Sequence, residues 1–387
     1  VGLPLAVEFG KRRSVLGFDI NQERIVELQS GLDHTLECSP AQLQEATHLA
    51  YSNQQDDLRA CQIYIVTVPT PVDKANRPDM APLVQASETV GKVLKTGDIV
   101  IYESTVYPGA TEEVCVPMLE KLSGLKFNQE FYCGYSPERI NPGDKVNTLT
   151  TIKKITSGST PEIADEVDAL YQQIIEAGTW KASSLKVAEA AKVIENSQRD
   201  LNIALMNELA QFSHLLGVDL WDAIRCASSK PFGFQAFYPG PGVGGHCIPI
   251  DPNYLSYRVK TQLGQPFRFI ELAQEINAGM PEYVRHRAQD LLNRDRKALN
   301  GSTVLLVGVT YKPNIADERE SPVRPLARGL FESGAVVQYH DAFVPQWNID
   351  SEHGQHDGDR PRVEPGPERA EQGRLHARSL LGEPGER

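Results

Sequence analysis

Short apolar runs alternate with helical segments over the first third of this 387-residue chain, and this alternation restricts its fold more than any other feature. The runs are rich in residues that favour β-strands and occupy residues 15–18, 63–68, 98–101 and 131–133, with a helix expected over 80–94. Strands that alternate with helices in this way form a parallel sheet that the helices cover. We therefore predict an α/β fold with a doubly wound parallel sheet.

The pattern of residues changes near residue 184, where a long segment with helical spacing begins. Residues 184–216 carry apolar side chains at helical spacing and contain no proline or glycine before Gly217. This predicts a helix longer than most helices of globular domains. A second helical stretch covers about 267–293. Together they predict an all-helical middle section, which either bridges two domains or forms a dimer interface.

The strand–helix pattern resumes after Asn300-Gly301. A buried strand that runs into a loop over 302–313, a helix over 322–333 and a strand over 335–343 predict the start of a second α/β domain. From about residue 350 the chain is rich in Gly, Pro, Arg and Glu and has no aromatic residue, so we predict a disordered tail. The tail cuts the second sheet short. A truncated or frame-shifted C-terminus explains this, and a natural linker is the alternative.

The charge and the cysteines narrow the choice of partners. A net charge of −12 disfavours nucleic acid or an anionic membrane as the main partner, although an anionic small molecule in a local basic pocket is compatible with it. No apolar run approaches the length that crosses a bilayer. The six cysteines are scattered, without a CxxC pair or metal-ligand spacing. We expect reduced thiols in a cytoplasmic protein, with no metal site.

Residues 240–252, with the sequence GPGVGGHCIPIDP, set one cysteine behind four glycines. Glycines at this density let the backbone come close to a ligand or to another segment. A thiol presented in this way predicts a nucleophile, Cys247, with Asp251 four residues later. The alternative is a packed turn around a buried structural cysteine. The glycines, His246 and Asp251 favour the nucleophile.

The first four residues, Val-Gly-Leu-Pro, are compatible with the end of a dinucleotide-binding GxGxxG loop. In this interpretation Gly2 is the third glycine, and Asp19, after the strand that follows, accepts hydrogen bonds from the ribose. A carboxylate at this position favours NAD over NADP because it repels a 2′-phosphate. The sequence lacks the first strand and the first two glycines of the fingerprint. The simpler interpretation is that such a glycine and such an aspartate are commonplace.

Three of the predicted strands run into polar loops. These loops are residues 69–71, residues 103–105 and residues 136–139. A doubly wound sheet places such loops at the carboxyl edge of its strands, where ligands bind. Any one of them is compatible with an ordinary loop, but three in succession predict that they line one crevice.

Two other sets of charged residues have alternative interpretations. Residues 189, 192, 196 and 199 recur at helical spacing on the long helix, as Glu, Lys, Asn and Arg. They form either a solvated salt-bridge stripe or an active-site face in which the Lys and the Asn stabilise an oxyanion. After the buried strand of the last domain, a Lys and an Arg within 311–322 either bind phosphates or form an exposed charged loop.

Taken in order, these motifs resemble those of the UDP-glucose/GDP-mannose dehydrogenase family, the nucleotide-sugar 6-dehydrogenases. The motifs are GLP near the start, VPTP, EST-x-x-PG, SPERINPG, AKVIENSQRDLNIALMNE, GPGVGGHCIPIDP and YKPN-x-x-DERESP. The resemblance covers roughly residues 1–346 and leaves only the tail without a counterpart. Several independent motifs in one order make it highly specific.

The resemblance implies an architecture and a reaction. It implies an NAD-binding Rossmann-like domain over 1–183 without its first strand, a central helical dimerisation domain over 184–298 that carries the cysteine, a partial UDP-binding Rossmann-like domain over 299–349, and the tail over 350–387. In the reaction, two NAD molecules oxidise the C6 alcohol of a nucleotide sugar to a carboxylate. We expect a UDP-sugar substrate, NAD as cofactor and a homodimer formed through the long helix.

The resemblance also implies roles for individual residues. Cys247 attacks the C6 aldehyde to form a thiohemiacetal, which the second oxidation converts to a thioester, and a nearby lysine lowers the pKa of the thiol. Lys192 and Asn196 stabilise oxyanion character. The other implied catalytic residues are Asp251 and Thr105, for proton transfer with an ordered water, and Glu138, which assists thioester hydrolysis.

Further residues are expected to bind the cofactor or the substrate. Those for the cofactor are Gly2, Asp19, Arg24, Thr67, Pro69, Thr70, Thr105 and Arg319, the last reaching the pyrophosphate or the neighbouring subunit. Those for the substrate are Glu138, Arg139, Lys192, Asn196, Phe237, Gly244 and Lys312. All of these assignments come from the resemblance.

One departure from the family pattern concerns the substrate. Family members that act on UDP-glucose carry a second glutamate four residues after that of SPE, and here this position is Pro142. The form ER-x-x-PG resembles the branch that acts on UDP-N-acetylhexosamines. We expect UDP-N-acetylglucosamine first, with the galactosamine and mannosamine epimers close behind, and a product that enters surface polysaccharides such as capsules and O-antigens.

Three alternatives stay open at this point. The chain is a UDP-glucose 6-dehydrogenase, or an inactive truncated homologue that only dimerises, or a one-step alcohol or hydroxyacid dehydrogenase. An enzyme of the last class needs no cysteine nucleophile, so replacement of Cys247 would leave its turnover intact.

Overall fold

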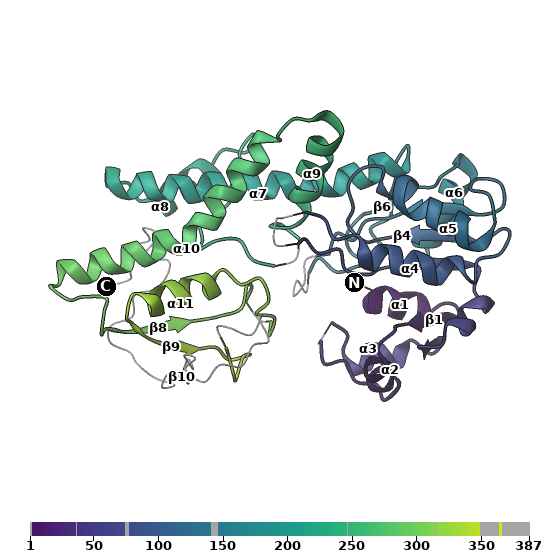
Figure 1. Ribbon diagram of the computed structural model, residues 1–387, viewed down its shortest axis with the longest axis horizontal. Helices are drawn as coiled ribbons and strands as arrows, with labels where there is room; N and C mark the ends of the chain where they lie inside the picture. The colour runs from purple at the N-terminus through teal and green to yellow at the C-terminus, as the bar shows by residue number, and fades with distance from the viewer. Residues whose placement is uncertain are drawn as a thin grey trace. The chain divides into compact units, whose positions relative to one another are not determined.

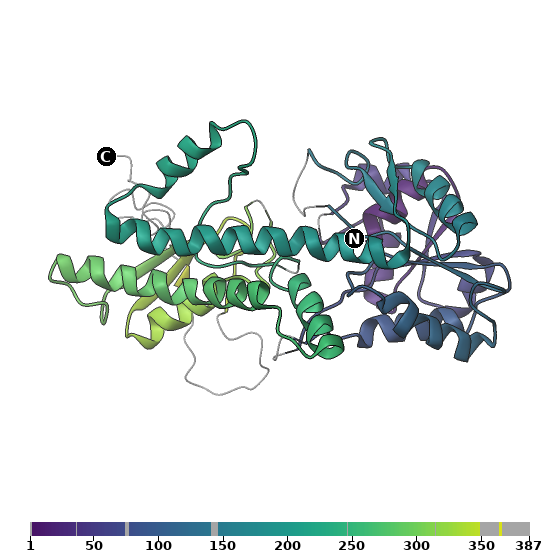
Figure 2. The same ribbon diagram turned by 90° about the horizontal axis from the view of Figure 1, so that it is seen from above.

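The computed structural model describes residues 2–35, 37–73, 77–140, 146–245, 247–313 and 315–348, together with the short strand Glu364–Pro365. These residues form two units. The first unit contains the residues up to Glu195 together with Asn253–Gly264, and the second contains residues 196–252 and those from Gln265 onward. Figures 1 and 2 show the elements of each unit from two directions.

Parallel strands form the framework of the first unit. Strands β3, β4 and β5 are hydrogen-bonded in that order, with Ile63 opposite Ile99 and Ile99 opposite Tyr132. Strands β1 and β2 form a second parallel pair, and β6 and β7 form a third. The bounds are β1 Val15–Phe18, β2 Leu49–Ser52, β3 Ile63–Val66, β4 Ile99–Tyr102, β5 Tyr132–Tyr135, β6 Lys154–Thr156 and β7 Thr179–Lys181.

Helices cover both faces of the central strand β4, and this explains its continuous apolar sequence. All four of its residues are buried, as in a parallel strand packed on both sides. Ile99 and Ile101 pack with Tyr171 of α6 in one core, whereas the Tyr102 hydroxyl lies 2.8 Å from Ser87 Oγ of α4. The helices are α1 Gly2–Gly10, α2 Gln22–Gln29, α3 Pro40–Glu45, α4 Ala81–Gly91, α5 Val116–Ser123 and α6 Pro161–Gln172, with short turns η1 Gln55–Ala60 and η2 Thr111–Cys115.

The local sequence sets where several of these helices begin. Asn21 caps α2 by accepting hydrogen bonds from two N–H groups of its first turn. Ser39 and Gln42 form a capping box at the start of α3. Thr160 caps α6, and Pro161 occupies the first helical position, where the missing N–H costs nothing.

The second unit combines helices with a small parallel sheet. Its strands follow the order β10-β9-β8, and α11 packs against α10. The bounds are α7 Leu185–Leu216, α8 Leu220–Ser228, α9 Asp251–Leu263, α10 Arg268–Arg294, β8 Thr303–Val307, α11 Val323–Glu332, β9 Val336–His340 and β10 Glu364–Pro365. The division between the units falls within α7 and again within α9. Figure 2 shows α7 as one unbroken helix.

One apolar core holds the second unit together. Met206 of α7, Ile224 of α8, Met280 of α10, Leu330 of α11 and Tyr339 of β9 belong to it, and each of them is buried. Full burial of such a side chain contributes about 1.5–3 kcal/mol. The helices of the middle section and the strands of the last domain therefore depend on each other for stability.

The predicted α/β fold is confirmed, and the predicted elements shift by only a few residues. The predicted helix over 184–216 is α7, and the stretch over 267–293 is α10. The run over 63–68 ends as a strand at Val66, since Thr67 turns into the polar loop. No helix in the described ranges is long and apolar enough to cross a membrane. Apart from β10, the predicted tail lies outside the described residues.

The contact between Gly158 and α6 gives a test of this packing. A Cβ at Gly158 would lie 2.2 Å from the backbone nitrogen of Ala164, so the helix would have to move. We expect Gly158→Ala to lower the free energy of unfolding by about 1–3 kcal/mol, measured by urea denaturation. Gly279→Ala is the matched control, since its Cβ meets nothing within 4 Å on an exposed face of α10. It should instead stabilise the protein by about 0.5–1 kcal/mol, and equal effects of the two changes would contradict the packing.

Candidate active site

The three predicted loops meet at the carboxyl edge of β3, β4 and β5. The hydroxyl of Ser104, in the loop after β4, donates to the carbonyl oxygen of Val68 after β3 at 2.6 Å. The Tyr135 hydroxyl, at the end of β5, donates to the carbonyl oxygen of Ser104 at 3.1 Å. Thr105 is partly buried at this edge. The loops therefore share one edge of the sheet, and a crevice that all three line stays a prediction.

A cavity of about 1240 Å³ in the first unit brings together half of the predicted cofactor residues. The four that line it are Gly2, Asp19, Arg24 and Thr67. Pro69, Thr70 and Thr105 lie outside its lining, and Arg319 belongs to the second unit. The loop of Pro69 and Thr70 is held elsewhere, because the Tyr254 hydroxyl of α9 donates to the carbonyl oxygen of Pro71 at 3.1 Å.

The cavity has an apolar part and a polar part. The apolar part includes Val15 of β1 and Ile63 and Ile65 of β3. Dinucleotide-binding sheets follow the strand order 3-2-1-4-5-6, and the two sheets β2-β1 and β3-β4-β5 match it with no described strand at position 1. The apolar part therefore lies where that order places a central strand. The polar part, with Asp19 and Arg24, has the chemistry that suits a nucleotide.

Gly2 and Asp19 have the geometry of the dinucleotide fingerprint. A Cβ at Gly2 would lie 2.5 Å from Thr67 Oγ1, so glycine allows α1 to approach the end of β3. Close packing of helix and strand is the function of the third glycine. Asp19 is exposed directly after β1, and its carboxylate accepts a hydrogen bond from the N–H of Asn21 at 2.8 Å. Both residues fit an NAD site.

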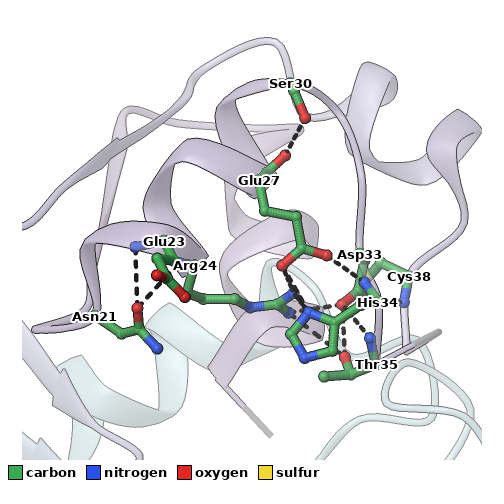
Figure 3. A network of polar contacts seen from close by, with 9 residues as sticks. All are labelled: Asn21, Glu23, Arg24, Glu27, Ser30, Asp33, His34, Thr35 and Cys38. Carbon is green, nitrogen blue, oxygen red and sulfur yellow. Dashed lines mark hydrogen bonds and ion pairs between the residues drawn. The ribbon is translucent and has the colours of Figure 1, made fainter.

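Two carboxylates hold the guanidinium of Arg24 in place (Figure 3). Arg24 donates to Asp33 at 2.6 Å and to Glu27 at 3.0 Å. Burial raises the pKa of Asp33, but hydrogen bonds from Thr35, from the Cys38 N–H and from Arg24 outweigh this effect and leave the pKa below its usual value. Because two carboxylates balance the charge of Arg24, its guanidinium attracts a 2′-phosphate only weakly. This agrees with the choice of NAD.

Glu138 is buried after β5 and is bound on several sides. Its Oε1 accepts hydrogen bonds from the N–H groups of Arg139 at 2.6 Å and Ile140 at 2.7 Å. The ammonium group of Lys192 donates to its carbonyl oxygen. Burial raises the pKa of Glu138, but the charge of Lys154, the two N–H groups and the charge of Lys192 outweigh this effect and lower the pKa. Glu138 is therefore an anion at neutral pH.

The polar face of α7 is not a solvated stripe. Glu189, Lys192 and Asn196 are buried, and Arg199 is partly buried. Glu189 accepts hydrogen bonds from the N–H groups of the loop at 109–111, and burial raises its pKa. The first interpretation of this face is therefore wrong for these three residues. In a solvated stripe the charged side chains of one helix pair with one another in water. Here each side chain instead forms hydrogen bonds with another segment of the protein.

Arg139 and Glu195 form an ion pair within the first unit. The guanidinium of Arg139 donates to Glu195 at 2.7 Å and also to the carbonyl oxygen of Lys153 at 2.6 Å. Glu195 is on α7, one turn from Lys192. The predicted substrate residue Arg139 is thus held against the same helix that carries Lys192.

Cys247 precedes α9 and is only partly buried. Its carbonyl oxygen accepts a hydrogen bond from the N–H of Asp251 at 2.8 Å, and the buried Asp251 carboxylate accepts one from Asn196 of α7. By contrast, burial raises the pKa of the Cys38 thiol and of the Cys115 thiol to about 12. Those two cysteines fit a structural role, and Cys247 has the exposure that a nucleophile needs.

The glycine-rich loop lies directly against residues 311–322. A Cβ at Gly244 would lie 2.7 Å from both the Glu320 carbonyl oxygen and Tyr311 Cβ, and one at Gly245 would lie 2.7 Å from the Tyr311 ring. Gly245 also has a φ of +90°. The glycines thus allow residues 311–322 to come close to the loop, which is one of the two uses predicted for them. At this point Gly244 contacts this segment of the protein and not open space.

A buried polar network anchors the start of this loop. Asn207 of α7 accepts a hydrogen bond from the Gly240 N–H at 2.9 Å and donates to Asn277 of α10 at 2.8 Å. Asn277 in turn donates to Asp200 at 2.7 Å. Burial raises the pKa of Asp200 to about 6. The loop is therefore tied to two helices of the second unit a few residues before Cys247.

The other predicted residues of the second unit have different surroundings. Phe237 is partly buried and packs against the core. The Lys312 ammonium lies 5.5 Å from the centre of the Tyr311 ring. Arg319 is exposed and forms an ion pair with Asp317 at 2.8 Å. Pro142 and His246 lie outside the described residues. No group of His, Cys, Asp and Glu in the described ranges is arranged to hold a metal ion.

Sequence reasoning missed Lys154, which lies beside Glu138. Its ammonium is 3.4 Å from Glu138 Oε2 and 2.8 Å from Glu103 Oε2. The partner Glu103 is 51 residues away in the sequence. The only signal in the sequence was the pair Lys153-Lys154 before a short apolar segment. A lysine pair at the solvated end of a strand has the same pattern.

Comparison with known proteins identifies the family. Its NAD binding domain matches residues 1–175, its central domain residues 186–279 and its UDP binding domain residues 305–365. The chain belongs to the UDP-glucose/GDP-mannose dehydrogenase family. It is therefore an NAD-dependent oxidoreductase of the nucleotide-sugar dehydrogenase class, and the predictions of family, enzyme class and cofactor are confirmed.

Two curated relatives and one solved structure are similar to this chain over most of its length. The chain is 54% identical to a UDP-N-acetyl-D-glucosamine 6-dehydrogenase of Pseudomonas aeruginosa and 50% identical to one of Salmonella typhi, in each case over 92% of this chain and 83% of the relative. A solved structure of a UDP-D-ManNAc dehydrogenase from Pyrococcus horikoshii superimposes with a TM-score of 0.83 at 32% identity, over 89% of this chain and 82% of that one.

The contact between Gly245 and Tyr311 gives a test of the loop. We expect Gly245→Ala to reduce NADH formation from a nucleotide sugar roughly 10²-fold, since the added Cβ displaces the segment that carries Cys247. Gly301→Ala is the control, because Gly301 also has a positive φ, of 79°, but its Cβ meets nothing within 4 Å. If both variants lose activity equally, backbone strain and not the Tyr311 contact is responsible.

Proposed function

We propose that this protein oxidises the C6 hydroxyl of a UDP-N-acetylhexosamine, with UDP-N-acetylglucosamine as the first candidate, to the uronic acid. The identity of 54% over 92% of the chain to a UDP-N-acetyl-D-glucosamine 6-dehydrogenase carries this proposal. The product enters surface polysaccharide synthesis. We place the reaction in the cytoplasm, where the six cysteines stay reduced.

The proposed reaction has two oxidations and one hydrolysis. NAD supplies the hydride acceptor for both oxidations. The first converts the C6 alcohol to an aldehyde, and the Cys247 sulfur adds to its carbonyl carbon to give a thiohemiacetal. The second converts the thiohemiacetal to a thioester. Water then attacks the thioester carbonyl, the Cys247 thiolate leaves, and a carboxylate is formed.

Contacts within each unit support the catalytic roles. In the second unit, the hydrogen bond from Asn196 orients the buried Asp251 carboxylate, which we propose to exchange protons with the substrate. In the first unit, the Lys192 ammonium is held at the carbonyl oxygen of Glu138. We propose that Lys192 and Asn196 stabilise the oxyanion and that Thr105 holds the water for proton transfer.

The remaining residues are proposed to bind ligands. Gly2, Asp19, Arg24 and Thr67 bind the adenosine half of NAD, which the polar part of the cavity supports. We propose cofactor contacts for Pro69 and Thr70 and substrate contacts for Arg139, Phe237, Gly244 and Lys312. Arg319, which is exposed beside Asp317, reaches the cofactor pyrophosphate or the neighbouring subunit.

We also propose a homodimer that forms through α7. Four of its apolar residues are exposed at spacings of four, three and four: Leu205, Leu209, Phe212 and Leu216. Phe269 and Leu272 of α10 in the same unit are also exposed. An apolar row of this kind on a helix is typical of a surface that a second helix covers.

The NADH yield per sugar tests the proposed reaction. We expect two NADH for each UDP-N-acetylhexosamine consumed, with UDP-N-acetylglucosamine used fastest, measured by absorbance on a panel of UDP-sugars. Cys247→Ala should form no acid, whereas Cys226→Ala, at an exposed cysteine of α8, should leave the yield unchanged. One NADH per sugar, or oxidation of UDP-glucose alone, would overturn the proposal. A dimer that oxidises no sugar would indicate the inactive homologue.

Sedimentation tests the dimer. Phe212→Asp should weaken self-association by more than roughly tenfold, because it places a charge at the centre of the apolar row. Phe232→Asp is the control, since Phe232 is as exposed as these residues but lies after α8. A monomeric wild type, or equal weakening by both changes, would contradict an interface on α7.

A further inference from the structure

Four buried side chains form a charged cluster around Glu138. Lys154, the first residue of β6, places its ammonium 2.8 Å from Glu103 Oε2 and 3.4 Å from Glu138 Oε2. The Tyr171 hydroxyl of α6 donates to the other oxygen of Glu103. The exposed fractions of Glu103, Glu138 and Lys154 are 1%, 8% and 2%. We call these four residues the Lys154 cluster.

Glu103 is sufficient to balance the charge of Lys154. A buried ammonium needs one carboxylate in good geometry, and Glu103 gives it that contact at 2.8 Å. Tyr171 adds a hydrogen bond to Glu103, and its ring centre lies 5.4 Å from the Lys154 ammonium. The second contact of Lys154, with Glu138, is therefore not needed for neutrality.

The contact with Lys154 completes the restraint of the Glu138 carboxylate. Its Oε1 is bound by two backbone N–H groups, and its Oε2 faces Lys154. From α7, Lys192 binds the Glu138 carbonyl oxygen and not the carboxylate. Arg139 is directed at Glu195. Among the described residues, Lys154 is thus the one side-chain cation in contact with the carboxylate.

We propose that Lys154, held by Glu103 and Tyr171, is a positioning residue that keeps the Glu138 carboxylate anionic and in one orientation for thioester hydrolysis. This rests on the proposed function, in which Glu138 assists that step. As water attacks the thioester carbonyl, Glu138 accepts a proton from the water, the carbon–sulfur bond breaks, and the electrons leave with the Cys247 thiolate. The proton then passes from Glu138 to solvent.

The electrostatics indicate what the loss of Lys154 would do. Burial raises the pKa of Glu138, and the charge of Lys154 is the largest of the effects that lower it. Without that charge the pKa of Glu138 rises, so a larger fraction of Glu138 is protonated at any given pH near or below that pKa. A protonated carboxyl cannot accept the proton of water. The acidic limb of the hydrolysis rate should therefore move to higher pH.

Rapid mixing with UDP-N-acetylglucosamine tests this proposal. Wild type should form two NADH per site and then turn over. Lys154→Met should keep this burst, lose hydrolysis roughly 10²-fold, and accumulate an acyl adduct on Cys247 that intact-protein mass spectrometry detects. Its acidic limb should rise by about 1–3 pH units. Lys154→Arg should restore most of the rate and of the pH profile.

Lys153→Met is the matched control, because this neighbouring lysine is exposed and its backbone carbonyl, which the change leaves in place, accepts the hydrogen bond from Arg139. It should behave as wild type. If Lys154→Met does not fold, Tyr171→Phe removes one hydrogen bond from Glu103 without changing a charge. Because that hydrogen bond lowers the pKa of Glu103, its loss makes Glu103 less anionic and leaves more of the Lys154 charge to act on Glu138. The acidic limb should therefore move to lower pH, by less than the shift expected in Lys154→Met.

The outcomes separate this inference from the proposed function. A wild type without a burst or an acyl adduct would overturn the proposed function, and the inference with it. If wild type shows the burst and the adduct, two results for Lys154→Met would overturn the inference alone. One is an unchanged rate of hydrolysis with an unchanged pH profile, and the other is an equal slowing of burst and hydrolysis with an unchanged pH profile. With Lys154→Met unfolded, an unchanged profile in Tyr171→Phe would do the same.

Discussion

Hydrogen bonds from the buried polar face of α7 position the loops that carry the candidate chemistry. Glu189 binds the loop at 109–111, Lys192 binds the backbone of Glu138, and Asn196 binds Asp251. A buried polar group left without its partner costs about 1–3 kcal/mol. Each loop conformation is therefore coupled to the helix, and a change on this face of α7 affects a loop distant in the sequence.

Compensated charge is the second common feature of the structure. Arg24 and Lys154 are each held by two carboxylates, yet their settings differ. Arg24 borders a cavity, where balance of its charge removes an attraction for a further phosphate. Lys154 is fully buried, where its charge acts on the carboxylate beside it. The same pairing thus borders the proposed cofactor cavity in one place and the proposed catalytic carboxylate in the other.

Much of the fold follows from local patterns. The apolar run at 15–18 is β1, and the segment without glycine or proline is α7. The short strands β2, β6 and β7 were not predicted, because their sequences LAYS, KIT and TWK lack the continuous apolar run that marks β3 and β4. The polar stripe of α7 was ambiguous for a related reason. Helical spacing shows which residues share a face, but whether water or protein covers that face depends on distant segments.

The sequence alone determined the parallel α/β class, the family, the NAD cofactor and the glycine-rich segment around Cys247, because each of these is encoded in residues close together in the chain. Only the tertiary structure decided that Lys154 and Glu103 surround Glu138, and that Gly244 and Gly245 lie against Tyr311. Burial and charge balance depend on contacts between segments far apart in the chain, and local sequence does not specify which segments meet.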